Sequence, residues 1–351
     1  MSRYFRANIA TMSGYVPGEQ PQDAGVIKLN TNENPYPPSP NVYKALKTAL
    51  NPSLRLYPEP QSDTLRTVAA TGYGVKPAHI IVGNGSDEVL SMLLRCFVGP
   101  RDRVAFPVPT YSLYDTLVEI QDGVAAAVDY SADFSVPPSL SEQNAALTFL
   151  CNPNAPSGTL VSLTEIERLA RSVAGILVVD EAYVDFAASE GASSIPLICQ
   201  LPNLIVLRSF SKSFSLAGMR IGLAFASEEI ISGIMKVKDS YNVNRLSLIA
   251  AAAALKDMPW MVRNVRRIQR SRRKLTTGLK RMGFDVYPSH ANFVLARKKG
   301  QNMKRIYDDL KLRKILVRYF DVPMLQDCLR ITVGTPIEVQ ALLKAMTAVE
   351  L

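Results

Sequence analysis

Cysteine is scarce in this 351-residue chain, and long apolar runs are missing from it. The four cysteines, Cys96, Cys151, Cys199 and Cys328, are scattered and form no CxxC pair, so we expect neither a zinc site nor a disulfide framework. No apolar run reaches the roughly 18 residues that span a bilayer. The N-terminal residues also lack the apolar core of a signal peptide. We therefore expect a protein of the reducing cytoplasm with no metal and no membrane contact.

Acidic residues are in the minority, and the formal net charge is +9. Much of the excess lies between Arg263 and Arg281, where Val265, Ile268 and Leu275 recur at near-helical spacing. This pattern predicts an amphipathic helix with a basic face in solvent. The basic residues are not interleaved with aromatic ones and belong to no recognised module, so we do not expect nucleic-acid binding.

The stretch from Leu207 to Gly222 carries the strongest chemical signal. An apolar run, residues 204–207, predicts a buried strand, and Lys212 follows it. A lysine in that place can form a Schiff base if its surroundings lower its pKa. Two hydroxyls and a guanidinium form a phosphate-binding set around it: Ser209, Ser211 and Arg220. A reactive amine beside a phosphate site indicates pyridoxal phosphate; the alternative is a solvated loop.

A second stretch, residues 175–183, favours the cofactor over the solvated loop. It reads as a buried strand that ends in Asp180, at the edge where open α/β sheets hold their ligands. Pyridoxal enzymes need a carboxylate there to keep the pyridine nitrogen protonated. Tyr183 follows three residues later and can donate a hydrogen bond to the ring oxygen. The alternative for Asp180 is a helix N-cap.

Together, residues 180–183, 209–212 and 218–222 resemble the fold-type I aminotransferases, and most of all the histidinol-phosphate aminotransferases. The resemblance covers nearly the whole chain. It implies that Tyr111 stacks on the pyridine ring and that Arg330 grips the anionic group of the substrate. It also implies that Tyr57 reaches the cofactor phosphate of a neighbouring subunit, so we expect a homodimer.

Two further turns carry candidate cofactor ligands. Ser86 or Asp87 can cap a helix after the strand at residues 79–82, and the free N–H groups of that helix suit a phosphate. The turn at residues 152–158 departs from the resembled family, which has an asparagine directly before Pro-Thr/Ser-Gly. Ala155 stands in that place here. Either Asn154 takes over the ring oxygen, or Tyr183 holds it alone.

Strands and helices alternate from His79 to Ala226, which predicts an α/β fold with a mostly parallel sheet and helices on both faces. We expect an N-terminal arm at residues 1–29, a large cofactor-binding domain at 30–259 and a smaller α/β domain at 260–351. The arm and the small domain are expected to cover the site.

Four residues outside the predicted sheet are candidates for binding substrate. Arg318 and Arg330 lie in apolar strand runs of the small domain, and a buried guanidinium needs an anionic partner. That partner is either the substrate or a structural carboxylate. Tyr15 of the arm, and Asn32 of an asparagine-rich loop that lines the site in the resembled family, are expected to join them.

The resemblance implies a reaction: transamination of histidinol phosphate with 2-oxoglutarate, giving imidazole-acetol phosphate and glutamate in histidine biosynthesis. Lys212 would hold the cofactor and transfer the proton. Two alternatives keep Lys212 and Asp180, namely an aromatic amino acid aminotransferase and a threonine-phosphate decarboxylase. A more distant alternative is a non-catalytic pyridoxal-binding regulator, against which the intact Lys212 argues.

Overall fold

A computed structural model describes residues 4–21, 23, 25–187 and 191–348. Its centre is a seven-stranded sheet of order β2-β8-β7-β6-β5-β3-β4. The strands are β2 (Ile80–Gly83), β3 (Arg103–Val108), β4 (Val124–Asp129), β5 (Leu147–Cys151), β6 (Ile176–Asp180), β7 (Leu204–Ser209) and β8 (Gly222–Phe225). Only β8 runs antiparallel to its neighbours in this sheet. The predicted mostly parallel α/β fold is therefore confirmed.

The central strands form because their residues are apolar on both faces. In β2, β5, β7 and β8 every residue is buried, which is typical of a sheet covered by helices on both sides. The helices before and around the sheet are α1 (Ala7–Thr11), α2 (Pro40–Ala49), α3 (Asp63–Tyr73), α4 (Ser86–Phe97), α5 (Leu113–Ile120), α6 (Leu163–Ser172), α7 (Glu228–Met235) and α8 (Arg245–Leu255). Short 3-10 turns join them: η1 (Pro52–Arg55), η2 (Pro77–His79), η3 (Pro138–Gln143), η4 (Val184–Phe186), η5 (Ile195–Cys199) and η6 (Ala217–Met219).

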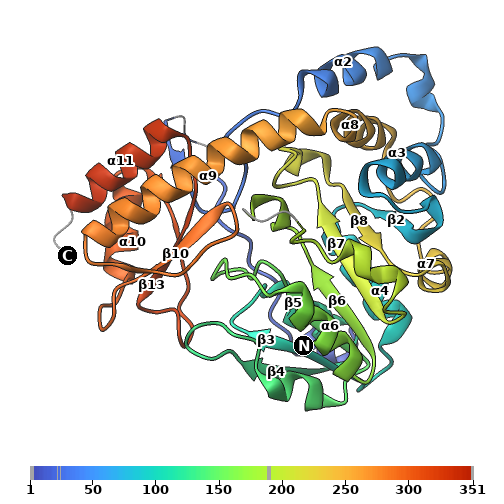
Figure 1. Ribbon diagram of the computed structural model, residues 1–351, viewed down its shortest axis with the longest axis horizontal. Coiled ribbons are helices and arrows are strands. Elements are labelled where there is room, and N and C mark those ends of the chain that lie inside the picture. Colours follow the sequence, from blue (N-terminus) through green and yellow to red (C-terminus); the bar gives the residue numbers. More distant parts are fainter. Residues whose placement is uncertain (1–3, 22, 24, 188–190, 349–351) are drawn as a thin grey trace.

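The long helix α9 (Met258–Arg281) leads from the sheet to a smaller unit (Figure 1). Its apolar residues Val265, Ile268, Leu275 and Leu279 are buried, and most of its arginines are exposed, which confirms the amphipathic pattern. The smaller unit contains an antiparallel sheet of order β12-β13-β10-β9. Its elements are β9 (Asp285–Val286), β10 (Phe293–Arg297), α10 (Lys304–Leu312), β11 (Ile315–Leu316), β12 (Arg318–Tyr319), β13 (Cys328–Thr332) and α11 (Pro336–Thr347).

The N-terminal segment joins the smaller unit. Strand β1 (Ile27–Lys28) pairs in parallel with β11. Backbone hydrogen bonds continue this contact, from Leu29 N to Leu316 O at 2.7 Å and from Thr332 N to Leu29 O at 2.9 Å. The residues that follow β1 are thereby carried across the edge of the large sheet. Among the described residues, no helix has the length and apolar character needed to cross a membrane.

Candidate active site

A pocket of about 440 Å³ lies where the carboxyl ends of the sheet strands meet the N-terminal segment and the smaller unit. Nearly all of the predicted site residues line it: Tyr15, Asn32, Ser86, Asp87, Tyr111, Asp180, Tyr183, Ser209, Ser211, Lys212, Arg220, Arg318 and Arg330. The fold thus brings together side chains that are more than 300 residues apart in the chain. Tyr57 and Asn154 are not among the residues that line this pocket.

Lys212 lies in the turn that follows β7 and points its amine into the pocket. Its Nζ atom makes one long hydrogen bond, 3.4 Å to the carbonyl oxygen of Thr31, and lies 5.6 Å from the centre of the Tyr183 ring. Burial, reinforced by the charge of Arg330, lowers the pKa of Lys212 to about 8. Part of the amine is therefore neutral near neutral pH, as a nucleophile or a proton acceptor must be.

Asp180 ends strand β6 and is buried. Its Oδ2 atom accepts a hydrogen bond from the Tyr114 hydroxyl at 2.9 Å, and its Oδ1 atom accepts one from Ala182 N at 3.1 Å. No described lysine or arginine pairs with it, and burial raises its pKa to about 6 in spite of these bonds. No helix begins at this aspartate: η4 starts four residues later and is capped at Tyr183. The N-cap alternative is therefore wrong.

A carboxylate kept out of water without a cationic partner is costly to the protein. A ligand that brings a positive charge to Asp180 removes that cost. The donor set around it, one hydroxyl and one backbone N–H, leaves the carboxylate able to accept a further hydrogen bond. Asp180 therefore suits a protonated ring nitrogen.

The part of the pocket opposite Asp180 forms an anion-binding site, which we call the phosphate cradle. Helix α4 begins at Ser86, its N-cap residue is Gly85, and no side chain caps its N-terminus, so the predicted capping by Ser86 or Asp87 is wrong. Arg220 Nη1 donates to Ser211 Oγ at 3.3 Å, and its Nη2 pairs with Asp87 at 3.0 Å. Gly222 permits this close packing, because a Cβ atom there would lie 2.4 Å from Ser86 N. Hydroxyls, a guanidinium fork and free helix N–H groups together suit a phosphate.

Tyr183 and Asn32 form a hydrogen bond with each other at the pocket wall. Asn32 Nδ2 donates to the Tyr183 hydroxyl oxygen at 3.1 Å, and Asn32 Oδ1 accepts from Thr332 Oγ1 at 3.0 Å. Tyr111 contacts Tyr15 edge to face, with ring centres 6.2 Å apart, so the arm reaches the aromatic wall of the pocket.

The structure contradicts the suggestion that Asn154 replaces the missing asparagine. Its amide is engaged by its own turn and by the turn after β3: Oδ1 accepts from Thr110 Oγ1 at 2.8 Å, and Nδ2 donates to Pro109 O at 3.2 Å and to Ser157 Oγ at 3.0 Å. Ala155, which has no polar side-chain atom, lines the pocket at this position. The Tyr183 hydroxyl is then the group that would donate a hydrogen bond to the ring oxygen of a cofactor.

Arg330 and Arg318 face each other across the pair β12–β13. Arg330 donates to the carbonyl of Asn30 at 2.8 Å, and its buried Nε atom has no partner in the described part of the chain. Both guanidinium groups lie over the Phe320 ring, at 5.4 and 5.3 Å, and neither pairs with a described carboxylate. Burial lowers the pKa of Arg330, with the charge of Arg318 adding to the effect. The structural ion-pair alternative is therefore wrong for the residues described.

Three participants were missed by sequence reasoning. Tyr114 holds Asp180, Glu33 lines the pocket, and Phe320 supports both arginines. Glu33 lies within the asparagine-rich loop and was open to detection there. Tyr114 and Phe320 each lie in ordinary apolar surroundings, and no local motif marks their contacts. Within the part of the chain that the structure describes, no cluster of three or more metal-ligating side chains occurs.

The family model for aminotransferase class I and II matches residues 24–346. A histidinol-phosphate aminotransferase 1 of Trichormus variabilis is 42% identical over 348 residues, 99% of each chain. That of Geotalea daltonii is 45% identical over 345 residues, 98% of this chain and 99% of the relative.

Solved structures agree with this grouping. The histidinol-phosphate aminotransferase from Sinorhizobium meliloti, in complex with pyridoxal-5'-phosphate, has a TM-score of 0.91 and 26% identity and covers 99% of this chain and 98% of its own. The L-threonine-O-3-phosphate decarboxylase from Porphyromonas gingivalis has a TM-score of 0.82 and 26% identity, with 92% and 99% covered. With full-length relatives above 40% identity and the shared fold, this chain belongs to the class I and II aminotransferases and, among them, to the histidinol-phosphate aminotransferase family.

Proposed function

We propose that the protein transaminates histidinol phosphate with 2-oxoglutarate, giving imidazole-acetol phosphate and glutamate, with pyridoxal phosphate as cofactor. One observation carries the proposal: Lys212, with its lowered pKa, shares a pocket with the unpaired Asp180, a phosphate cradle and two unpaired arginines. The names of the full-length relatives support the choice of donor. The reaction is a step of histidine biosynthesis, and we place it in the cytoplasm.

The pocket fits pyridoxal phosphate at three separate points. Asp180 suits the protonated ring nitrogen, the cradle of Ser209, Ser211, Arg220 and the α4 N-terminus suits the phosphate, and Lys212 suits the aldehyde. When bound, the cofactor draws electrons from the substrate carbon and so stabilises the negative charge left when a proton departs. Tyr111 and Tyr183 would hold the ring by stacking and by a hydrogen bond to its oxygen.

The residues of this chain supply positioning and proton transfer. Neutral Lys212 Nζ would take the proton from the amine-bearing carbon of the substrate. It would return a proton to the aldehyde carbon of the cofactor, on the other side of the amine nitrogen. Asp180 would keep the ring nitrogen of the cofactor protonated. Tyr114 favours this role because its hydrogen bond stabilises the ionised carboxylate.

Both substrates carry an anion that the arginine pair can bind. The donor presents a phosphate and the acceptor a carboxylate, and Arg330 with Arg318 offers two guanidinium groups that no described carboxylate neutralises. Asn32 and Tyr15 would close the pocket from the N-terminal side. The pair alone does not select among donors, because the alternative substrates, aromatic amino acids and threonine phosphate, carry anionic groups too.

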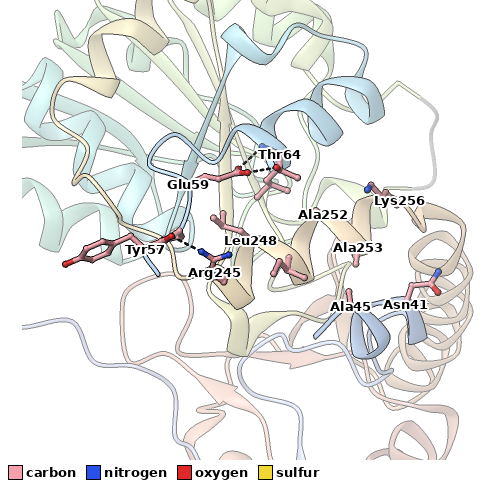
Figure 2. A pocket seen from close by; sticks show the side chains of 13 residues that line it. Asn41, Ala45, Tyr57, Glu59, Thr64, Arg245, Leu248, Ala252, Ala253 and Lys256 are labelled. Carbon is pink, nitrogen blue, oxygen red and sulfur yellow. Dashed lines mark hydrogen bonds between the residues drawn. The ribbon is translucent and has the colours of Figure 1, made fainter. Parts of the chain in front are cut away.

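We also propose that two copies of the chain form the working unit. A cavity of about 660 Å³ lies between α2, α3 and α8, and Lys212 is not among the residues that line it (Figure 2). Beside it, the Tyr57 side chain is 76% exposed and stacks on Tyr241 with ring centres 4.4 Å apart. Arg245 Nη2 holds the Tyr57 carbonyl at 2.8 Å, and Figure 2 shows the ring directed away from the cavity.

Exposed apolar side chains lie near Tyr57 in the sequence, and Tyr241 stacks on its ring. Several large apolar side chains of this region are exposed: Tyr43, Leu50, Leu54, Leu56 and Tyr241. Apolar surface gathered in this way marks protein–protein contacts. A second copy placed here would cover the patch and bring its own Tyr57 toward the phosphate cradle of the first.

We expect Asp180→Asn to show that Asp180 acts through its charge and not through a contribution to the stability of the fold. Asparagine keeps an oxygen for Ala182 N, and loss of an unpaired buried charge removes its desolvation cost, so the melting temperature should not fall. Turnover should fall on the order of a hundredfold or more, as when other charge-stabilising groups are removed. Asp129→Asn, at the exposed end of β4, is the matched control and should change neither. Normal turnover per folded Asp180→Asn molecule would contradict the role.

Donor choice is tested on the native protein by comparing kcat/KM for histidinol phosphate, phosphate-free histidinol and phenylalanine. We expect a strong preference for histidinol phosphate. Arg330→Lys keeps the charge but loses the fork, so both half-reactions should lose about ten- to a hundredfold in kcat/KM. Arg305→Lys, an exposed residue of α10, is the control. Equal use of phenylalanine would favour the aromatic aminotransferase alternative.

Tyr57→Phe tests the shared site. The ring still packs, so the protein should remain a dimer in sedimentation at micromolar concentration. The lost hydroxyl should raise the Kd for pyridoxal phosphate about tenfold, the loss expected for one hydrogen bond to a charged group. Tyr43→Phe, on the same surface, should bind the cofactor normally. A monomeric native protein would overturn this part of the proposal.

A further inference from the structure

A cluster of polar side chains lies directly behind the pocket and takes no part in the mechanism above. Arg208 and Glu181 are its buried centre, with side chains 6% and 0% exposed. Its members lie on β6, β7 and the turns that follow them: Glu181, Asp185, Ser193, Ser194, Arg208 and Ser213. We call this group the Arg208 cluster.

The ends of β6 and β7 supply both pocket residues and members of this cluster. Glu181 follows Asp180, Arg208 precedes Ser209, and Ser213 follows Lys212. Neighbouring residues on an extended chain point to opposite sides, so Asp180 and Ser209 face the pocket while Glu181 and Arg208 face the cluster. In the turn after β7, Lys212 lines the pocket and the Ser213 hydroxyl reaches Asp185. The cluster is thus connected, one residue away, to the groups that would hold the cofactor.

Two carboxylates and one arginine hold the cluster together. Arg208 pairs with Asp185 through Nη2 and lies 3.5 Å from Glu181 Oε2 through Nη1. Glu181 also accepts hydrogen bonds from Ser193 and from the backbone and side chain of Ser194. The guanidinium carbon lies 5.2 Å from the centre of the Tyr73 ring. Buried charges held by several partners at once have little freedom to move.

Asp185 connects this centre to the Lys212 turn. One of its oxygens pairs with Arg208, and the other accepts a hydrogen bond from the Ser213 hydroxyl. From the other side, Asn34 Nδ2 donates to the carbonyl oxygens of Lys212 and Ser213 at 3.1 and 3.2 Å. The backbone that carries the Lys212 side chain is therefore held between Asn34 and Asp185.

We propose that Asp185, acting through Ser213 and fixed by Arg208, is a positioning residue that sets where the Lys212 amine lies relative to Asp180. The effect that this positioning has on turnover rests on the proposed function. The positioning itself is a property of the protein alone. Among the described residues the Lys212 amine has one hydrogen bond, a long one, so its place depends on the backbone of its turn.

The first test uses the protein without cofactor and measures hydrogen exchange of the amides in residues 210–216. Ser213→Ala and Asp185→Asn should speed exchange in this segment and leave the rest of the sheet unchanged. Ser215→Ala is the matched control, since it removes a hydroxyl from the same turn whose Oγ has no hydrogen-bond partner among the described residues. Equal protection in Ser213→Ala and Ser215→Ala would overturn the proposal, whatever reaction the protein catalyses.

The second test uses the protein loaded with pyridoxal phosphate. For Ser213→Ala and Asp185→Asn we expect kcat to fall about tenfold or more with KM nearly unchanged, since small misplacement of a catalytic group is costly. The pH midpoint of the visible absorbance change should also shift, by about half a unit or more, because the surroundings of Lys212 change. A fall in melting temperature with native kcat and midpoint would show a merely structural role. Absence of the absorbance band in the native protein would instead contradict the proposed function.

Discussion

Burial of charged groups that the chain leaves unpaired is the constraint on which the pocket depends. Asp180 and Lys212 form no ion pair with a described residue, and Arg330 contacts a carbonyl and aromatic rings in place of an anion. Burial shifts the pKa of each group in the direction that favours its neutral form. Such an arrangement costs stability, and it persists because the surrounding sheet and helices hold it in place. The ligand, in turn, supplies the missing charges.

The topology explains how these groups come together. Parallel pairing of β5, β6 and β7 sets Asp180 and the Lys212 turn side by side at one edge of the sheet. The antiparallel strand β8 returns the chain beside them and places Arg220 over Gly85, at the start of α4. The β1–β11 pair carries Asn30, Thr31 and Asn32 across the same edge. The pocket is therefore complete only where the sheet, the arm and the smaller unit meet.

Sequence reasoning identified the residues whose role is indicated by a local sequence pattern. Lys212 and Asp180 each follow a buried apolar run, so their place at the sheet edge could be predicted. Asn154 could not be assigned correctly, because its amide bonds to Ser157 in its own turn and to Thr110, 44 residues away, and that is visible only in three dimensions. Tyr114 reaches Asp180 from 66 residues away, and Asp185 reaches Ser213 from 28. Contacts of this kind leave no periodic signal. The predicted domain limits and the role of Tyr57 in a partner subunit stay predictions.

The central claim is that Lys212 is the residue that carries pyridoxal phosphate. It is tested most directly by loading the protein with the cofactor, reducing it with borohydride and locating the label by peptide mapping. We expect one labelled site, at Lys212, and no label in Lys212→Ala, which should still bind the cofactor without covalent attachment. A label on another lysine, or an unlabelled native protein that retains full turnover, would contradict the account.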